Sequence, residues 1–114
     1  MSYGVLGYHQ RVISKMVERA SRTLGGHLTQ WRKLRGLTAE QVAERAGIST
    51  STLYRIEHGS ASVSLESVLE VFRALGILDV VVGSADPLKS DVGRLRMSEE
   101  LPERIRNSSN RRKT

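Results

Sequence analysis

The chain has 114 residues, no cysteine and a formal net charge of +6 at pH 7. This length fits one compact domain, and an apolar fraction of 39% is enough for one modest core. The lack of cysteine excludes disulfides and thiolate-bound metals. The positive charge favours a polyanionic partner, which could be nucleic acid, an anionic membrane surface or an acidic protein.

The N-terminal sequence MSYGVLGYHQ lacks the basic start and the long apolar run of a signal peptide. No window of the sequence approaches the roughly 18 consecutive apolar residues that are needed to cross a bilayer. We therefore expect an intracellular, cytoplasmic protein that does not span a membrane.

Residues 10–35 carry a stripe of apolar side chains at three- and four-residue steps, which is typical of one helix face. The stripe consists of Ile13, Val17, Ala20, Leu24, Leu28 and Trp31. Gly25 and Gly26 interrupt it, and each Gly weakens a helix interior by about 1 kcal/mol relative to Ala. We expect one helix near residues 10–24 and a second near 27–35, either separate or fused, with a stop at Gly36.

Two short helices follow. Thr38 and Gln41 have the spacing of a capping box, in which each side chain satisfies a free backbone donor of the other residue. Gly47 suits the left-handed position that ends a helix, and Ser49 is a good N-cap for the next one. The pattern predicts two helices joined by a tight turn.

The next predicted helix begins at Ser64 and ends at Gly76. After it, ILDVVVG over residues 77–83 is β-branched and predicts a strand. A single strand has no sheet to join, so we expect Val80, Val81 and Val82 to pair with a second copy of the chain. From Asp86 onward the sequence becomes polar, and ERIRNSSNRRKT has the composition of a disordered basic tail.

The spacing of small and apolar residues between positions 39 and 58 fits a helix-turn-helix. The constrained positions hold Val42, Ala43, Ala46, Gly47, Ile48, Leu53 and Ile56. Alanine at position 43 allows the two helices to approach closely, and the glycine makes the turn. The alternative is an ordinary corner between two helices without a ligand, which seven matching positions make the weaker interpretation.

With these residues the segment from Leu28 to Ile77 resembles the Xre/Cro family of helix-turn-helix DNA-binding proteins. The resemblance implies an all-α, lambda-repressor-like domain, a dimer and operator binding. We divide the chain into an N-terminal helical extension at 1–25, the DNA-binding domain at 26–77, the dimerisation strand at 78–85 and the basic tail at 86–114.

The resemblance places the first turn of the second motif helix in the major groove. The candidate base-reading positions are Thr50, Ser51, Tyr54 and Arg55. Arg55 is the strongest, because a guanidinium can donate two parallel hydrogen bonds to guanine. Ser49 and Thr52 are suited to helix capping or phosphate contact, and Tyr54 is equally suited to phosphate contact and to packing.

The family motif also pairs an arginine of the preceding helix with a glutamate at the end of the recognition helix, which here are Arg32 and Glu57. The sequence departs from the family at Ala39, where a phosphate-binding glutamine is usual. We therefore expect the phosphate contacts to come from other polar and basic residues. The candidates are Gln41, Lys33, Arg35, Arg45 and the basic ends of the chain.

Catalysis and metal binding have little support. The three histidines, at positions 9, 27 and 58, are scattered and have no carboxylate at ligand spacing. The many serines and threonines lack a matching base, and there is no phosphate-binding glycine loop. We expect no enzyme activity, no metal and no cofactor.

These observations predict a sequence-specific repressor that binds double-stranded DNA as a homodimer on a pseudo-palindromic operator. A helix-turn-helix followed by a strand and a basic tail also resembles HipB-like antitoxins, which repress their own operon and inhibit a HipA-type kinase toxin. A stand-alone regulator is one alternative. The other is a protein-interaction module that keeps the helix-turn-helix only as a scaffold.

Overall fold

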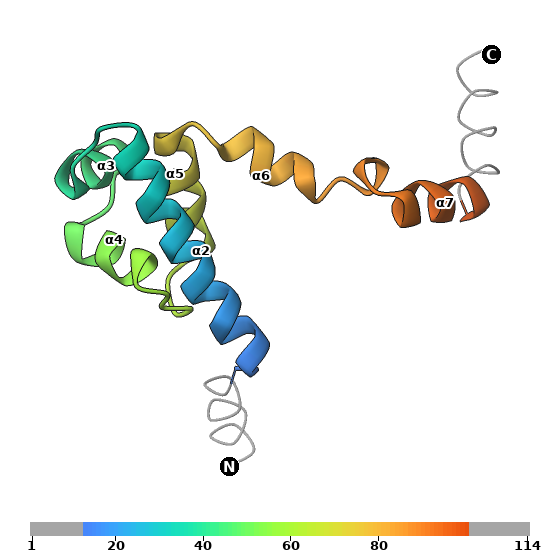
Figure 1. Ribbon diagram of the computed structural model, residues 1–114, viewed down its shortest axis with the longest axis horizontal. Helices are drawn as coiled ribbons and strands as arrows, with labels where there is room; N and C mark the ends of the chain where they lie inside the picture. Colours follow the sequence, from blue (N-terminus) through green and yellow to red (C-terminus); the bar gives the residue numbers. More distant parts are fainter. Residues whose placement is uncertain (1–12, 101–114) are drawn as a thin grey trace. The chain divides into compact units, whose positions relative to one another are not determined.

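The computed structural model describes residues 13–100, and every regular element within that range is helical (Figure 1). The chain divides after Leu78 into two compact units. The first unit contains α2, α3, α4 and α5, whose packing against one another forms the core. The apolar side chains of this core are Leu28, Val42, Ala43, Ala46, Leu53, Ile56, Val71, Phe72, Leu75 and Ile77.

Helix α2, Lys15–Leu34, runs through Gly25 and Gly26 without a break, so the two predicted N-terminal helices are fused. It starts at Ser14, whose side chain accepts a hydrogen bond from the Val17 backbone N–H at 3.1 Å. It stops before Gly36, which has the left-handed φ of 68°. Residues 10–12 of the predicted first helix lie outside the described part of the chain.

Helices α3, Ala39–Ala46, and α4, Thr50–Glu57, form the predicted tight pair. The capping box is confirmed: the Thr38 N–H donates to Gln41 Oε1 at 2.9 Å, and the Gln41 N–H donates to Thr38 Oγ1 at 3.1 Å. Gly47 has φ 71° and ends α3, as its lack of a Cβ allows. Two residues later Ser49 caps α4.

Helix α5, Leu65–Leu75, starts at the predicted Ser64 cap and ends at Gly76. It packs on α3 and buries Val71, Phe72 and Leu75. Arg73 adds a polar link, because its Nη2 donates to the backbone carbonyl of Arg45 at 2.8 Å while its Nε donates to Glu70. This link attaches α5 to the end of α3, immediately before the turn of the motif.

The predicted strand over residues 77–83 is wrong. Ile77 joins the core, and residues Leu78–Ser84 form the short helix α6. The β-branched side chains favour a strand only where a neighbouring strand can satisfy the backbone, whereas a helix satisfies it locally. Val80 and Val82 remain 72% and 57% exposed and Val81 is half-buried, so these valines do not form the predicted dimerisation strand.

The part of the predicted basic tail that the structure describes is helical. Pro87–Lys89 form the 3-10 helix η1, capped by Asp86, and Asp91–Glu100 form α7. An ion pair between Arg94 and Asp91 and a hydrogen bond from Arg94 to the Leu88 carbonyl supply local support. The basic sequence ERIRNSSNRRKT lies outside the described residues.

Candidate nucleic-acid interface

Helix α4 has one buried side and one polar, solvent-exposed side. Leu53 and Ile56 are buried against the rest of the first unit. On the opposite side, at steps of one, three and four residues, lie the exposed side chains of Thr50, Ser51, Tyr54 and Arg55. The four predicted base-reading residues therefore share one surface, and α4 cannot rotate without exposing its apolar residues.

A hollow of about 470 Å³ lies beside this surface. Thr50, Ser51 and Tyr54 of α4 line it together with Ala39 and Glu40, the first two residues of α3. The remaining lining residues are Arg32, Leu53, Glu57 and His58. The hollow thus brings the start of α3 beside three of the four predicted base-reading positions, whereas Arg55 lies outside it.

Ser49 and Thr52 serve to cap α4. Ser49 Oγ accepts a hydrogen bond from the Thr52 N–H at 3.1 Å and donates to Thr52 Oγ1 at 2.9 Å. The cap satisfies one of the backbone donors left free at the start of the helix. Its geometry fixes the first turn of α4, where Thr50 and Ser51 lie.

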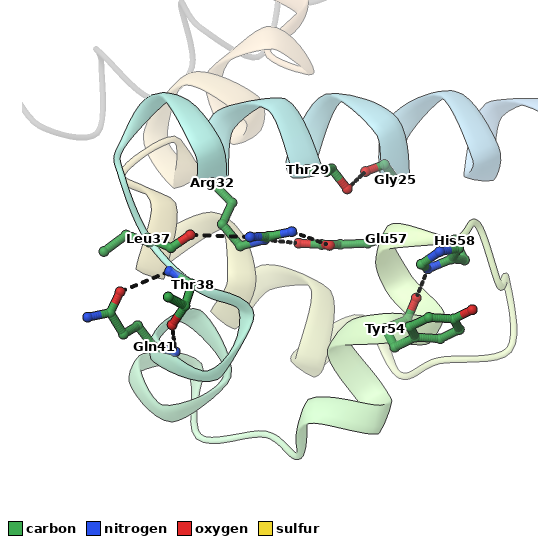
Figure 2. Close-up of polar contacts among 9 residues, drawn as sticks. All are labelled: Gly25, Thr29, Arg32, Leu37, Thr38, Gln41, Tyr54, Glu57 and His58. Atoms are coloured by element: carbon green, nitrogen blue, oxygen red, sulfur yellow. Dashed lines mark hydrogen bonds and ion pairs between the residues drawn. The ribbon is translucent and has the colours of Figure 1, made fainter.

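Arg32 and Glu57 form the ion pair that the resemblance implies (Figure 2). Arg32 Nε donates to Glu57 Oε2 at 2.8 Å and Nη2 donates to Oε1 at 3.2 Å, while Nη1 donates to the Leu37 carbonyl at 3.2 Å. Their side chains are 16% and 8% exposed. The hydrogen bond to Glu57 raises the pKa of the Arg32 guanidinium, and burial opposes that rise only in part. The pair joins α2, the start of the motif and the end of α4.

Gly25 allows α2 to approach the C-terminal end of α4 closely, which the sequence pattern did not reveal. A Cβ at this position would lie 2.6 Å from the backbone carbonyl oxygens of both Ile56 and Glu57. The neighbouring Gly26 has open space instead. The signal available in the sequence was a glycine inside an apolar helical stripe, which can indicate close backbone packing as well as a break.

Tyr54 and His58 form a stacked pair at the end of α4 (Figure 2), which was also not predicted. The ring centroids are 3.7 Å apart and the rings are inclined by 21°. His58 Nδ1 lies 2.8 Å from the Tyr54 carbonyl oxygen, which holds the imidazole over the last turn. Tyr54 is still 62% exposed, so packing against His58 leaves it accessible to a ligand.

The predicted phosphate-binding residues are dispersed. Gln41 is exposed, but its amide oxygen accepts the capping hydrogen bond of α3, which leaves its amide N–H groups available. Lys33, in the last turn of α2, and Arg45, in the last turn of α3, are exposed and do not line the hollow. Arg35 lies over the Trp31 ring, with Cζ 5.4 Å from the ring centroid.

Within residues 13–100, no cluster of three or more histidine or acidic residues could hold a metal ion. No helix in that range combines the length and the apolarity that crossing a membrane requires.

Comparison with known proteins agrees with this geometry. A family described as a helix-turn-helix domain matches residues 23–82, which include the second half of α2 and all of α3, α4 and α5. No curated protein and no solved structure matches the chain.

Proposed function

The chain belongs to the helix-turn-helix domain family, which matches more than half of it, and on that premise we propose that it is a sequence-specific DNA-binding repressor. The observation that carries the proposal is the exposed polar side of α4, formed by Thr50, Ser51, Tyr54 and Arg55, on a helix held by its buried side. A binding role needs no catalytic residue, and we assign none. A cytoplasmic location accords with this role.

The dimensions of α4 suit the major groove of DNA. An α-helix with its side chains is about 10–12 Å across, and the major groove of B-DNA is about 12 Å wide. In this docking mode Arg55 donates two hydrogen bonds to a guanine, a contact worth about 1–3 kcal/mol of discrimination. Thr50 and Ser51 make less selective contacts with base edges or a thymine methyl group.

Lys33, Arg45 and Gln41 are proposed to contact the phosphate backbone, aided by the overall charge of +6. Such contacts release counterions, so the affinity for DNA should fall steeply as the salt concentration rises. Thr52 contributes less, because it is only partly exposed and a hydrogen bond from Ser49 holds its hydroxyl in the cap of α4.

A pseudo-palindromic operator requires a dimer, and we place the contact on α5. Leu65, Leu69 and Leu78 line an apolar hollow of about 410 Å³ there, together with the charged residues Glu66, Glu70 and Arg73. Apolar side chains with charges of both signs at the rim suit a two-fold interface, in which the same surface meets itself. This surface takes the place of the strand that does not form.

The proposal is tested by fluorescence-anisotropy titration of the protein against its own promoter fragment and a scrambled duplex of equal length. Preference for the promoter should persist at moderate salt in the wild-type protein and disappear in Arg55→Ala. Arg96→Ala is the matched control, because it removes the same charge from an exposed position of α7, beyond the matched residues. Equal affinity for the two duplexes in the wild-type protein would refute sequence-specific binding.

A second candidate function is that of an antitoxin which also binds a HipA-type kinase. The observation that favours it is that α6, η1 and α7 have no buried residue. Five of their large apolar side chains are more than half exposed, at Val80, Val82, Leu88, Val92 and Leu95. A helical segment with so little packing gains stability when a partner covers it.

The antitoxin function predicts a kinase-like reading frame beside this gene. The purified kinase should lose activity when the full chain is added, and Leu95→Asp should weaken that inhibition without changing affinity for the promoter. Inhibition that is absent, with promoter binding intact, would leave a stand-alone regulator. Unchanged promoter binding in Arg55→Ala, together with kinase inhibition, would instead support a protein-interaction module that uses the helix-turn-helix as a scaffold.

A further inference from the structure

Glu40 places a carboxylate on the surface that we propose to meet DNA. It is exposed, it lies in the first turn of α3, and it lines the same hollow as Thr50, Ser51 and Tyr54. The capping box between Thr38 and Gln41 fixes the turn from which Glu40 projects. Its position is therefore set by the fold and not by a flexible loop.

The hollow has an excess of negative charge because of Glu40. Its other two formally charged lining residues, Arg32 and Glu57, neutralise each other through the two hydrogen bonds described above. None of the ion pairs formed within residues 13–100 includes Glu40. A chain with a net charge of +6 thus presents, on its proposed contact surface, a carboxylate that forms no ion pair, although its charge helps to raise the pKa of the nearby Arg32 guanidinium.

The docking of a helix-turn-helix determines what this carboxylate meets. The second helix of the motif lies in the major groove while the first crosses the sugar-phosphate backbone. Glu40 belongs to the first helix, α3, so in the proposed docking its nearest neighbours on DNA are phosphates. Charges of the same sign repel each other, and a carboxylate oxygen accepts hydrogen bonds but cannot donate one to a phosphate oxygen.

We propose that Glu40 weakens the attraction of this protein to the DNA backbone and so limits its affinity for DNA of any sequence. This inference rests on the proposed function. The general attraction due to the basic chain is sequence-independent, and a repulsive group on the contact surface reduces it. The base contacts of α4 then supply a larger share of the binding at the operator.

The test compares Glu40→Gln with Glu99→Gln, which makes the same change of charge at an exposed position of α7. Both variants and the wild-type protein are titrated against the promoter fragment and the scrambled duplex at about 50 mM and about 200 mM salt. Glu40→Gln should bind both duplexes about threefold more tightly at the lower salt concentration, with a smaller gain at the higher one. Glu99→Gln should bind both as the wild-type protein does.

Two results would overturn the inference. Equal affinities of the two variants would show that Glu40 lies away from the DNA, and a weaker affinity of Glu40→Gln for the promoter alone would show that its carboxylate accepts a hydrogen bond from a base. The failure of the proposed function is recognised separately, because it is judged from the wild-type protein's preference between the duplexes. Circular dichroism of both variants checks that the helical fold is retained.

Discussion

Replacing Gly25 by alanine should disturb the packing of α2 on α4, although it favours the helix locally. The added Cβ would lie 2.6 Å from two backbone carbonyl oxygens of α4, where ordinary contact begins near 3.4 Å. The separation must therefore grow by about 0.8 Å, the difference between these two distances. Backbone cannot move aside as the end of a flexible side chain can, so α4 itself must shift.

The neighbouring glycine isolates the cost of this clash. Gly26→Ala adds a Cβ that meets nothing within 4 Å, and it should stabilise the protein by about 0.5–1 kcal/mol through helix propensity alone. Gly25→Ala gains the same propensity but adds an overpacking cost of about 1–3 kcal/mol. The difference in unfolding free energy between the two variants should therefore be about 1–3 kcal/mol.

Urea unfolding followed by circular dichroism measures this difference, with the slope of the transition as a check on two-state behaviour. A difference of 1 kcal/mol corresponds to about 4–8 °C in Tm for a domain of this size. Gly25→Ala should also lose affinity for the promoter, since the shift displaces the exposed side of α4. Equal stabilisation by both substitutions would refute the close-packing explanation.

Three further substitutions test other contacts. Glu57→Ala should lower the unfolding free energy by about 2–3 kcal/mol, because it leaves the Arg32 guanidinium poorly solvated and without its carboxylate. Glu18→Ala breaks only an exposed ion pair and should lower it by at most about 0.5 kcal/mol. Urea titrations of both variants measure the difference. A group whose pKa is raised by folding stabilises the protein below its unfolded-state pKa, and this stabilisation is lost only as the pH rises through its folded-state pKa. The contribution of Arg32 to the unfolding free energy should therefore stay constant across neutral pH. A decline of this contribution near pH 7 would contradict the assignment. Ser49→Ala should cost about 1 kcal/mol by removing the α4 cap, while Ser49→Asp should keep most of that stability; equal losses in thermal melts would argue against capping. Leu65→Arg should convert the proposed dimer into monomers in sedimentation velocity, and Leu34→Arg, at another exposed leucine, should not; a dimer that survives Leu65→Arg would rule out the α5 contact.

Features that depend on neighbouring residues were predictable. Thr38 and Gln41, three residues apart, are sufficient to form the capping box, and Gly47 ends α3 because glycine readily adopts a left-handed conformation. The division of α4 into a buried and an exposed side follows from helical periodicity. The Arg32–Glu57 ion pair was implied by a resemblance to a family, since residues 25 positions apart carry no local signal of contact.

Features that depend on distant backbone were not predictable from the same patterns. The helix propensity of glycine indicated a break at Gly25, but the contact with α4 decides its role, and that contact joins residues more than thirty positions apart. The valines of α6 favoured a strand, but β-propensity acts only where a second strand is present. The stack of His58 on Tyr54 and the hollow beside α4 likewise arise from how α4 ends and how α3 approaches it.

The sequence by itself determined the helix-turn-helix, because caps, turns and apolar spacing act over a few residues and each favours the same local conformation. Only the tertiary structure decided how closely α2 approaches α4, and that Glu40 lies beside the exposed side of α4. These are distances between separate elements, and they are set by side-chain volumes and by the burial of a shared core. A pattern along one chain segment contains no measure of them.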